Sequence, residues 1–258
     1  MKSNSIRIAA VILVCSLAAA CVTSGPTGKV SEPDKEEAAR LNLDLGITYL
    51  QQGKLQDALD KLRKSVEANP QNPSAYRVMG FVYEQLQDPA RAEQAYRDAV
   101  RQGPDDQQAL NALAVYLCVN ADDVTEPLRY FDRALNLPEY QNRHEIFTNA
   151  GRCAMKRNLE LAEQYLRRGL RLRADNPQAL YLLADVSFRQ AQYLQARAFI
   201  ERRLASGAAQ PDALWLAERI ETALGDSVAA QTYRARLLGD FPNSMQAQQA
   251  LEAQRERG

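Results

Sequence analysis

The sequence predicts an all-α fold, an α-solenoid built from about six helix-turn-helix repeats. Three observations predict it: residues from Leu41 onward repeat at a spacing of 34 positions, small and large apolar residues recur at fixed places in each unit, and proline closes the clearest units. Alternating apolar and polar runs, which indicate strands, are not found. Because one helical hairpin leaves an apolar face uncovered, each unit must stack on a neighbour.

The first two units match each other position by position. The signature of the first unit returns 34 positions later in the second: Leu45, Gly46, Tyr49, Ala58, Leu62 and Pro70 become Met79, Gly80, Tyr83, Ala92, Tyr96 and Pro104. The small residues let two helices approach closely, and proline cannot continue a helix interior. This period and these residue types are those of the tetratricopeptide repeat (TPR). An ordinary helical bundle would match them only by chance.

The chain divides into a leader, a tether and a repeat domain. We expect a signal peptide over 1–20, a lipidated flexible tether over 21–38 and the TPR domain over 39–258. The repeats are expected at 39–72, 73–106, 107–141, 142–176, 177–210 and 211–244, with a capping helix over 245–256. The third unit has about one extra residue in its turn, and Pro138 to Arg143 predicts an irregular link.

The N-terminus has the layout of a lipoprotein leader. A short basic region precedes an apolar stretch from Ile8 to Ala20, which is too short to span a membrane. The stretch ends in Leu-Ala-Ala-Ala-Cys, which resembles the bacterial lipobox and implies lipidation of Cys21, with Val22 favouring the outer membrane. Several acyl chains would anchor the protein stably. A plain signal peptide, with Cys21 left unmodified, is the alternative.

Neither composition nor motifs favour catalysis. Basic and acidic residues balance at 32 each, so no basic excess suggests a nucleic-acid partner. The single histidine, His144, is expected on the surface and cannot build a metal site alone. Phosphate-binding glycine loops and G-x-S-x-G, HExxH and CxxC motifs are not found. We therefore expect a protein that is not an enzyme, with no cofactor, metal or small-molecule substrate.

Two cysteines fall within the repeats. Cys118 and Cys153 lie near corresponding points on the first helices of adjacent units, which pack side by side. In an oxidising periplasm they could form a disulfide that closes a ring of about 35 residues. The alternative is a pair of reduced thiols buried in the core.

The concave side of a TPR stack is lined by the first helix of each hairpin. In the first unit the ligand-facing positions include Leu43, Ile47 and Leu50; Phe81 follows Ile47 by one period, and Val78 lies beside it. Apolar residues at places that the hairpin seam does not require predict a groove for a partner's peptide, helix or strand. Alternatively, these residues only pack on neighbouring repeats.

Several segments extend the resemblance beyond the repeat signature. They are Leu41–Tyr49, Asn111–Cys118, Asn149–Cys153 with the later Ala162-Glu163-x-Tyr165, Ala213–Ala217, and Phe241-Pro242-x-Ser244. With the lipobox, they resemble the type IV pilus biogenesis and stability lipoproteins, the PilF/PilW-like pilotins, over nearly the whole chain. Ala114, where many members carry glycine, and Ala18 in the lipobox depart from the pattern.

The resemblance implies a periplasm-facing lipoprotein held in the outer membrane by its N-terminal lipid. Such a protein binds pilus secretin subunits and promotes their localisation and multimerisation in the outer membrane, and hence pilus biogenesis. The alternative is a TPR adaptor lipoprotein of another envelope assembly, either β-barrel assembly or the regulation of cell-wall synthases. Sequence periodicity alone would look the same in both.

Overall fold

The computed structural model of the chain describes residues 35–138 and 142–255. These residues form thirteen α-helices and no strand, so the prediction of an all-α TPR solenoid is confirmed. The expected signal peptide, Cys21 and the tether as far as residue 34 lie outside the described residues. Within the described part, no helix is both long and apolar enough to cross a membrane.

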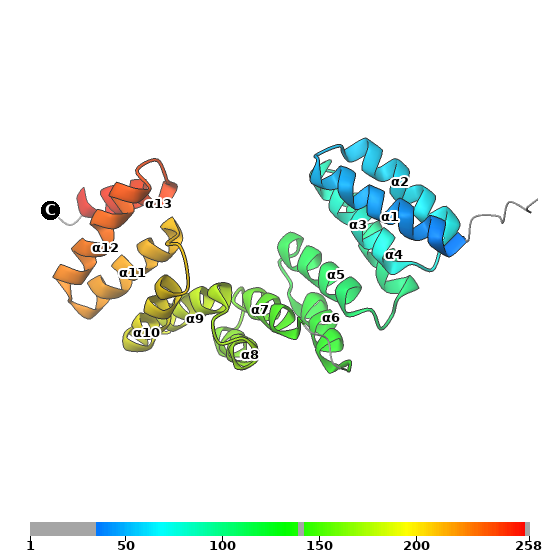
Figure 1. The fold of residues 1–258 in the computed structure, drawn as a ribbon. Helices are drawn as coiled ribbons and strands as arrows, with labels where there is room; N and C mark the ends of the chain where they lie inside the picture. The colour runs from blue at the N-terminus through cyan, green and yellow to red at the C-terminus, as the bar shows by residue number, and fades with distance from the viewer. Residues whose placement is uncertain (1–34, 139–141, 256–258) are drawn as a thin grey trace, which may run out of the picture.

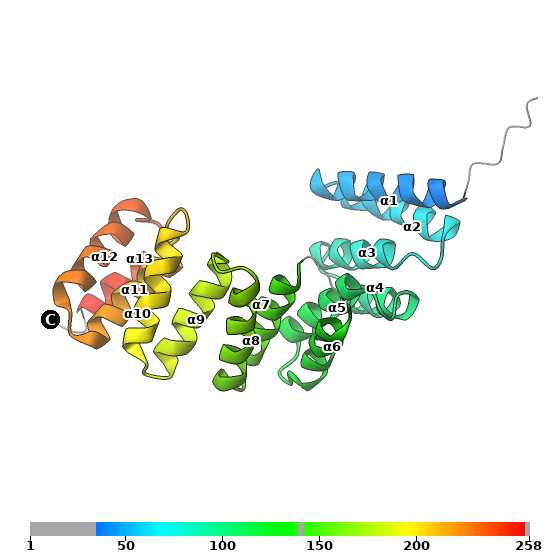
Figure 2. The same cartoon turned by 60° about the horizontal axis from the view of Figure 1, so that its bottom comes forward.

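Twelve of the helices form six consecutive hairpins, and the last one closes the stack. The pairs are α1 (Lys35–Gln51) with α2 (Leu55–Ala68), α3 (Pro73–Gln85) with α4 (Pro89–Gln102), α5 (Gln107–Asn120) with α6 (Thr125–Asn136), α7 (Arg143–Ala154) with α8 (Leu159–Leu172), α9 (Pro177–Arg189) with α10 (Tyr193–Ala205), and α11 (Pro211–Leu224) with α12 (Ser227–Asp240), followed by α13 (Met245–Arg255). Each hairpin stacks on the next along the chain (Figure 2).

The first helix begins earlier than the sequence suggested. Residues 35–38, which we assigned to the tether, form the first turn of α1. Glu36 and Glu37 in that turn interact favourably with the positive end of the helix dipole. Ala39 is buried, and its carbonyl oxygen accepts a hydrogen bond of 2.7 Å from Ser65 Oγ. The start of α1 is therefore held to α2 by a tertiary contact.

Local capping fixes where the later helices begin. Asn72 accepts a hydrogen bond of 3.0 Å from Ser74 N, and Asn176 accepts one of 3.1 Å from Gln178 N. Each of these caps is followed by proline at the first helical position, where the missing N–H costs nothing. These asparagine-proline pairs explain why α3 and α9 start abruptly.

Glycine allows the helices within a hairpin to approach closely. A Cβ atom added to Gly80 would lie 2.6 Å from the Tyr96 ring, and one added to Gly151 would lie 2.5 Å from Leu166 Cγ. Tyr96 and Leu166 are both almost completely buried. The seams of these two hairpins are therefore each filled by one large side chain that lies over a glycine.

The C-terminal helix covers the last hairpin. Ala247 and Ala250 of α13 pack with Leu214 of α11 and Leu237 of α12 in a small separate apolar cluster. Most other residues of α13 are exposed and polar. This arrangement gives the terminal repeat the polar outer face that a repeat stack needs in water.

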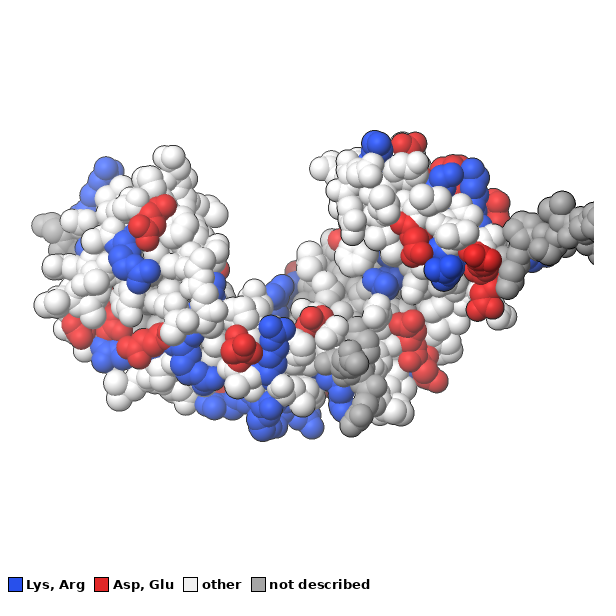
Figure 3. Space-filling view, viewed as in Figure 1, with Lys and Arg blue, Asp and Glu red and all other residues white. Residues whose placement is uncertain are grey.

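The stack curves into an arch (Figure 1). One end is formed by α1–α4 and the other by α11–α13, while α5–α10 form the span between them. The surface is hollowed between the two ends (Figure 3). The second helices α8 and α10 lie on the convex side of the span.

Candidate protein-binding groove

The first helices α3, α5 and α7 line a pocket of about 370 Å³. Its apolar lining consists mainly of Phe81 of α3, Val115 of α5 and Ile146 of α7. The remaining lining residues are mostly polar: Arg77, Glu84, Tyr96, Gln107, Gln108, Asn111, Ala112, Tyr116, Glu145 and Asn149. An apolar centre with a polar rim is the usual composition of a surface that binds another protein.

Phe81 is the large apolar side chain that this pocket presents to solvent. It is 44% exposed, although its ring packs edge-on against Tyr96 with centroids 5.7 Å apart. Tyr96 in turn lies 5.3 Å from the Tyr116 ring. Because the two tyrosines are buried, Phe81 rests on a packed aromatic base and is held in a fixed position.

The Tyr96 hydroxyl donates a hydrogen bond to the Glu84 carboxylate on the preceding helix. Burial raises the pKa of Tyr96 above its usual value, and the hydrogen bond to Glu84 adds to this. The Tyr116 hydroxyl donates to the Pro89 carbonyl oxygen at 2.7 Å. Both phenols therefore stay neutral and fix the orientation of the rings beneath Phe81.

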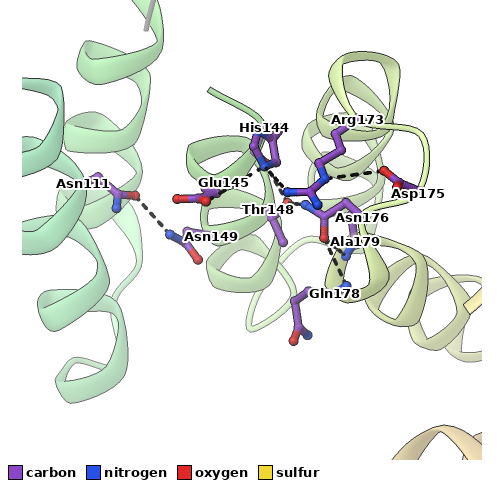
Figure 4. Close-up of polar contacts among 10 residues, drawn as sticks. All are labelled: Asn111, His144, Glu145, Thr148, Asn149, Arg173, Asp175, Asn176, Gln178 and Ala179. Atoms are coloured by element: carbon purple, nitrogen blue, oxygen red, sulfur yellow. Dashed lines mark hydrogen bonds and ion pairs between the residues drawn. The ribbon is translucent and has the colours of Figure 1, made fainter. Parts of the chain in front are cut away.

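An amide pair crosses the pocket between neighbouring repeats. Asn149 Nδ2 on α7 donates to Asn111 Oδ1 on α5 at 3.1 Å (Figure 4). Both side chains are only half-buried, and each amide has further donor and acceptor capacity. The wall of the pocket can therefore offer hydrogen bonds to the backbone of a bound segment.

The lone histidine lies elsewhere than expected. His144 is 8% exposed in the first turn of α7, so the prediction of a surface histidine is wrong. Its Nε2 lies 3.5 Å from Arg173 Nη1, and its carbonyl oxygen accepts a hydrogen bond from Thr148 (Figure 4). Thr148 Oγ1 accepts from the Asn176 amide that caps α9. His144 therefore belongs to a buried polar chain that joins two repeats.

A disulfide joins the two cysteines of the repeats in this structure. The sulfur atoms of Cys118 and Cys153 are bonded, with Cα atoms 5.8 Å apart. Cys153 is fully buried and Cys118 nearly so. Beside them, Lys156 Nζ donates a hydrogen bond of 3.1 Å to the Ala121 carbonyl oxygen. The bond and this contact connect α5 and α7 at one edge of the span.

The structure disperses the five residues expected to form the groove. Of these residues, only Phe81 lines the pocket. Leu43, Ile47 and Leu50 are half-buried on α1, where they pack against the apolar core. Val78 is 5% exposed and belongs to that core, so it offers a partner almost no surface.

The sequence reasoning missed the polar lining of the pocket, although a signal was present. Val115 follows Phe81 by one period of 34 residues, and Asn111 follows Arg77 by the same spacing. Extending the repeat from the second unit into the third would have placed all four residues on one surface. Asn149 was harder to predict, because it lies 38 residues after Asn111 and not one period of 34.

The described residues show no arrangement that suggests catalysis. None of them form a group of three or more His, Cys, Asp or Glu side chains that could hold a metal ion. The titratable groups with raised pKa values at the pocket, Tyr96 and Tyr116, are both engaged in structural hydrogen bonds. The site is suited to binding by shape, apolar contact and amide hydrogen bonds.

Comparisons with known proteins agree with this description. The tetratricopeptide repeat family matches residues 37–116. The type IV pilus assembly protein PilF of Pseudomonas aeruginosa is 26% identical over 253 residues, which cover 95% of this chain and 98% of PilF. The crystal structure of PilW, a widely conserved type IV pilus biogenesis factor, superposes with a TM-score of 0.77 at 28% identity and covers 83% of this chain and 99% of PilW. The chain is a TPR protein that is similar to PilF and PilW in sequence and fold.

A second solved structure supports the same fold for this PilF/PilW-like protein. The structure of P. aeruginosa PilF gives a TM-score of 0.75 at 24% identity and covers 85% of this chain and 99% of that one. The match to both structures extends across the repeats and leaves the relatives almost fully covered. Like other TPR stacks, the PilF/PilW-like protein is built to bind proteins, and the pocket on α3, α5 and α7 is its candidate binding site.

Proposed function

We propose that this chain is an outer-membrane lipoprotein pilotin of a type IV pilus system. It binds pilus secretin subunits and promotes their outer-membrane localisation and multimerisation, and thereby pilus biogenesis. The proposal is supported by similarity to PilF and PilW over nearly the whole chain. The lipobox at Cys21, although outside the described residues, fits the same role.

The observation that carries the proposal is the pocket on the concave side of the arch. Its exposed Phe81, set in a polar rim, suits the docking of one apolar side chain from a partner segment. The half-buried amides of Asn111 and Asn149 stand beside it and can bond the backbone of the same segment. A secretin segment bound here would be held by one apolar contact and several hydrogen bonds.

The lipid and the groove would have separate tasks in this mechanism. Acylation of Cys21 fixes the protein at the membrane, and the groove selects the secretin subunit. Holding the two on one chain raises the effective concentration of secretin at the bilayer, so modest groove affinity is sufficient. The reaction needs no cofactor, since only binding and assembly are involved.

A pull-down in a deletion strain tests the proposal. The tagged protein is crosslinked in envelopes and its partners are identified by mass spectrometry, while secretin multimers are followed on gels. We expect recovery of the pilus secretin, and loss of its multimers on deletion. Recovery of barrel-assembly or cell-wall components instead, with secretin multimers intact, would overturn the assigned partner.

Variants connect this result to the groove. Phe81→Glu places a charge in the apolar centre of the pocket and is expected to abolish secretin recovery. Leu194→Glu is the matched control, because Leu194 is 70% exposed on α10, outside the pocket. Equal recovery of secretin by both variants would remove the groove from the proposal.

A further inference from the structure

Positive charge gathers on the side of the arch opposite the groove. Lysine and arginine side chains concentrate along the convex edge near α8 and α10 (Figure 3). We define the convex arginine face by Arg167, Arg168 and Arg171 of α8 together with Arg202 of α10. Except for the half-buried Arg167, these side chains are exposed.

The convex arginine face contains a shallow pocket of about 250 Å³ with an apolar base. Phe199 and Leu170 line it together with Arg167, Arg171 and Arg202. The guanidinium groups of Arg167 and Arg202 lie 5.4 Å and 5.9 Å from the centroid of the Phe199 ring. Cations around a small apolar base match an amphipathic anion, such as a phosphate attached to glycerol and acyl carbons.

Most of this charge is not neutralised within the protein. Arg167 pairs with Glu163 at 2.7 Å. By contrast, Arg168, Arg171 and Arg202 form no ion pair with any carboxylate among the described residues. Some exposed arginines elsewhere in the stack are paired, as Arg91 is with Asp88 and Arg101 with Asp98. Arg168 lies over the Phe147 ring, and Arg202 donates a hydrogen bond to the Ala174 carbonyl oxygen, so neither contact cancels the positive charge. Three exposed arginines on α8 and α10 without a carboxylate partner favour an anionic partner.

We propose that the convex arginine face docks on the anionic headgroups of a phospholipid bilayer. Guanidinium groups bind phosphate through paired hydrogen bonds, and each arginine near an anionic membrane strengthens binding by about fivefold. Because this face lies opposite the pocket of α3, α5 and α7, docking leaves the groove open to the aqueous side. The membrane then orients the groove as well as retaining the protein.

The position of the proposed acyl anchor agrees with this arrangement. About 14 residues separate Cys21 from the start of α1, and a fully extended segment of that length spans roughly 45 Å. The repeats therefore stay close to the bilayer, whereas electrostatic attraction acts only within about 10 Å. The anchor thereby keeps the repeats near the bilayer, and contact of the convex arginine face with the headgroups would set their orientation.

Vesicle binding of the unacylated protein tests the proposal. A chain starting at Val22 lacks the leader and Cys21 but retains every described residue. It is mixed with vesicles of phosphatidylcholine, with or without phosphatidylglycerol, and sedimented. We expect binding only to the phosphatidylglycerol vesicles, with an affinity that falls as salt rises. Equal binding to vesicles of phosphatidylcholine alone would overturn the proposal.

Matched variants separate this face from total charge. The triple variant R168Q/R171Q/R202Q is expected to bind phosphatidylglycerol vesicles about 100-fold more weakly. The control variant R63Q/R236Q/R255Q removes three exposed arginines elsewhere and is expected to bind these vesicles normally. Circular dichroism confirms folding. Unchanged vesicle binding by R168Q/R171Q/R202Q would overturn the proposal. If this variant keeps vesicle binding but no longer captures an acidic protein, the face binds protein and not lipid. Either outcome is independent of secretin binding by the groove.

Discussion

Replacing Gly80 by alanine should destabilise the second repeat and displace the base of the groove. The new Cβ would lie 2.6 to 2.8 Å from three atoms of the Tyr96 ring, closer than side-chain carbons approach in folded proteins. Tyr96 cannot move freely, because Phe81, Tyr116 and the hydrogen bond to Glu84 hold it. Overpacking of this kind costs about 1–3 kcal/mol, whereas alanine gains about 1 kcal/mol in helix propensity. We expect a net loss of up to about 2 kcal/mol.

Chemical denaturation followed by circular dichroism measures this loss. Gly239→Ala is the control, because Gly239 lies in α12 with nothing within 4 Å of an added Cβ. There the change should raise stability by roughly 0.5–1 kcal/mol. Near-ultraviolet circular dichroism should also report a changed environment of Tyr96 in the first variant only. If Gly80→Ala were as stable as the control, the close-packed seam and the rigid base of Phe81 would both be wrong.

Three further predictions concern the disulfide, the groove and alkaline pH. Cys118→Ser should lower the free energy of unfolding by about 4 kcal/mol, because the closed ring spans 35 residues, and dithiothreitol should do the same to the parent chain; equal stability with and without reductant would contradict this. Phe81→Glu should weaken secretin binding at least tenfold in a purified binding assay, while Leu194→Glu binds normally and both variants keep their helicity. Burial raises the pKa of Tyr181 to about 12, so the folded state favours the neutral phenol and the free energy of unfolding should fall as pH rises from about 10 to 12. Tyr181→Phe should reduce this fall when melting is measured against pH. An unchanged pH profile in the variant would contradict the assignment.

The fold could be predicted because its determinants are local and repeated. Gly46 and Gly80 lie 34 residues apart, as do the large side chains that pack on them, Leu62 and Tyr96. Each pair marks the place where the two helices of a hairpin pack closely. The sequence also places Cys118 and Cys153 on first helices of adjacent units, which the structure brings together. Such features can be predicted from the repeat period and the geometry of an α-helix alone.

The groove was harder to predict because it depends on helix rotation. Val78 shares its helical face with Val82, four residues later, and both are buried. Phe81 instead shares its face with Arg77, and both line the pocket. We chose Val78 as a groove residue beside Phe81 because it is apolar. The spacing of four residues instead indicates that Arg77 lies beside Phe81 on the surface of the helix.

Contacts of the fourth unit could not be predicted from the period of 34 residues. Asn149 meets Asn111 across a spacing of 38 residues. His144 is buried and lies beside Arg173, at the end of α8. A local pattern cannot supply these contacts, since they result from packing between repeats.

We propose that the concave pocket around Phe81 binds the pilus secretin. Site-specific photo-crosslinking in living cells tests it most directly, with a photoreactive residue placed at position 81 or, as control, at position 194. We expect a covalent adduct that contains the secretin from position 81 and none from position 194. A secretin adduct from position 194 alone, or adducts from position 81 that contain only other envelope proteins, would contradict it.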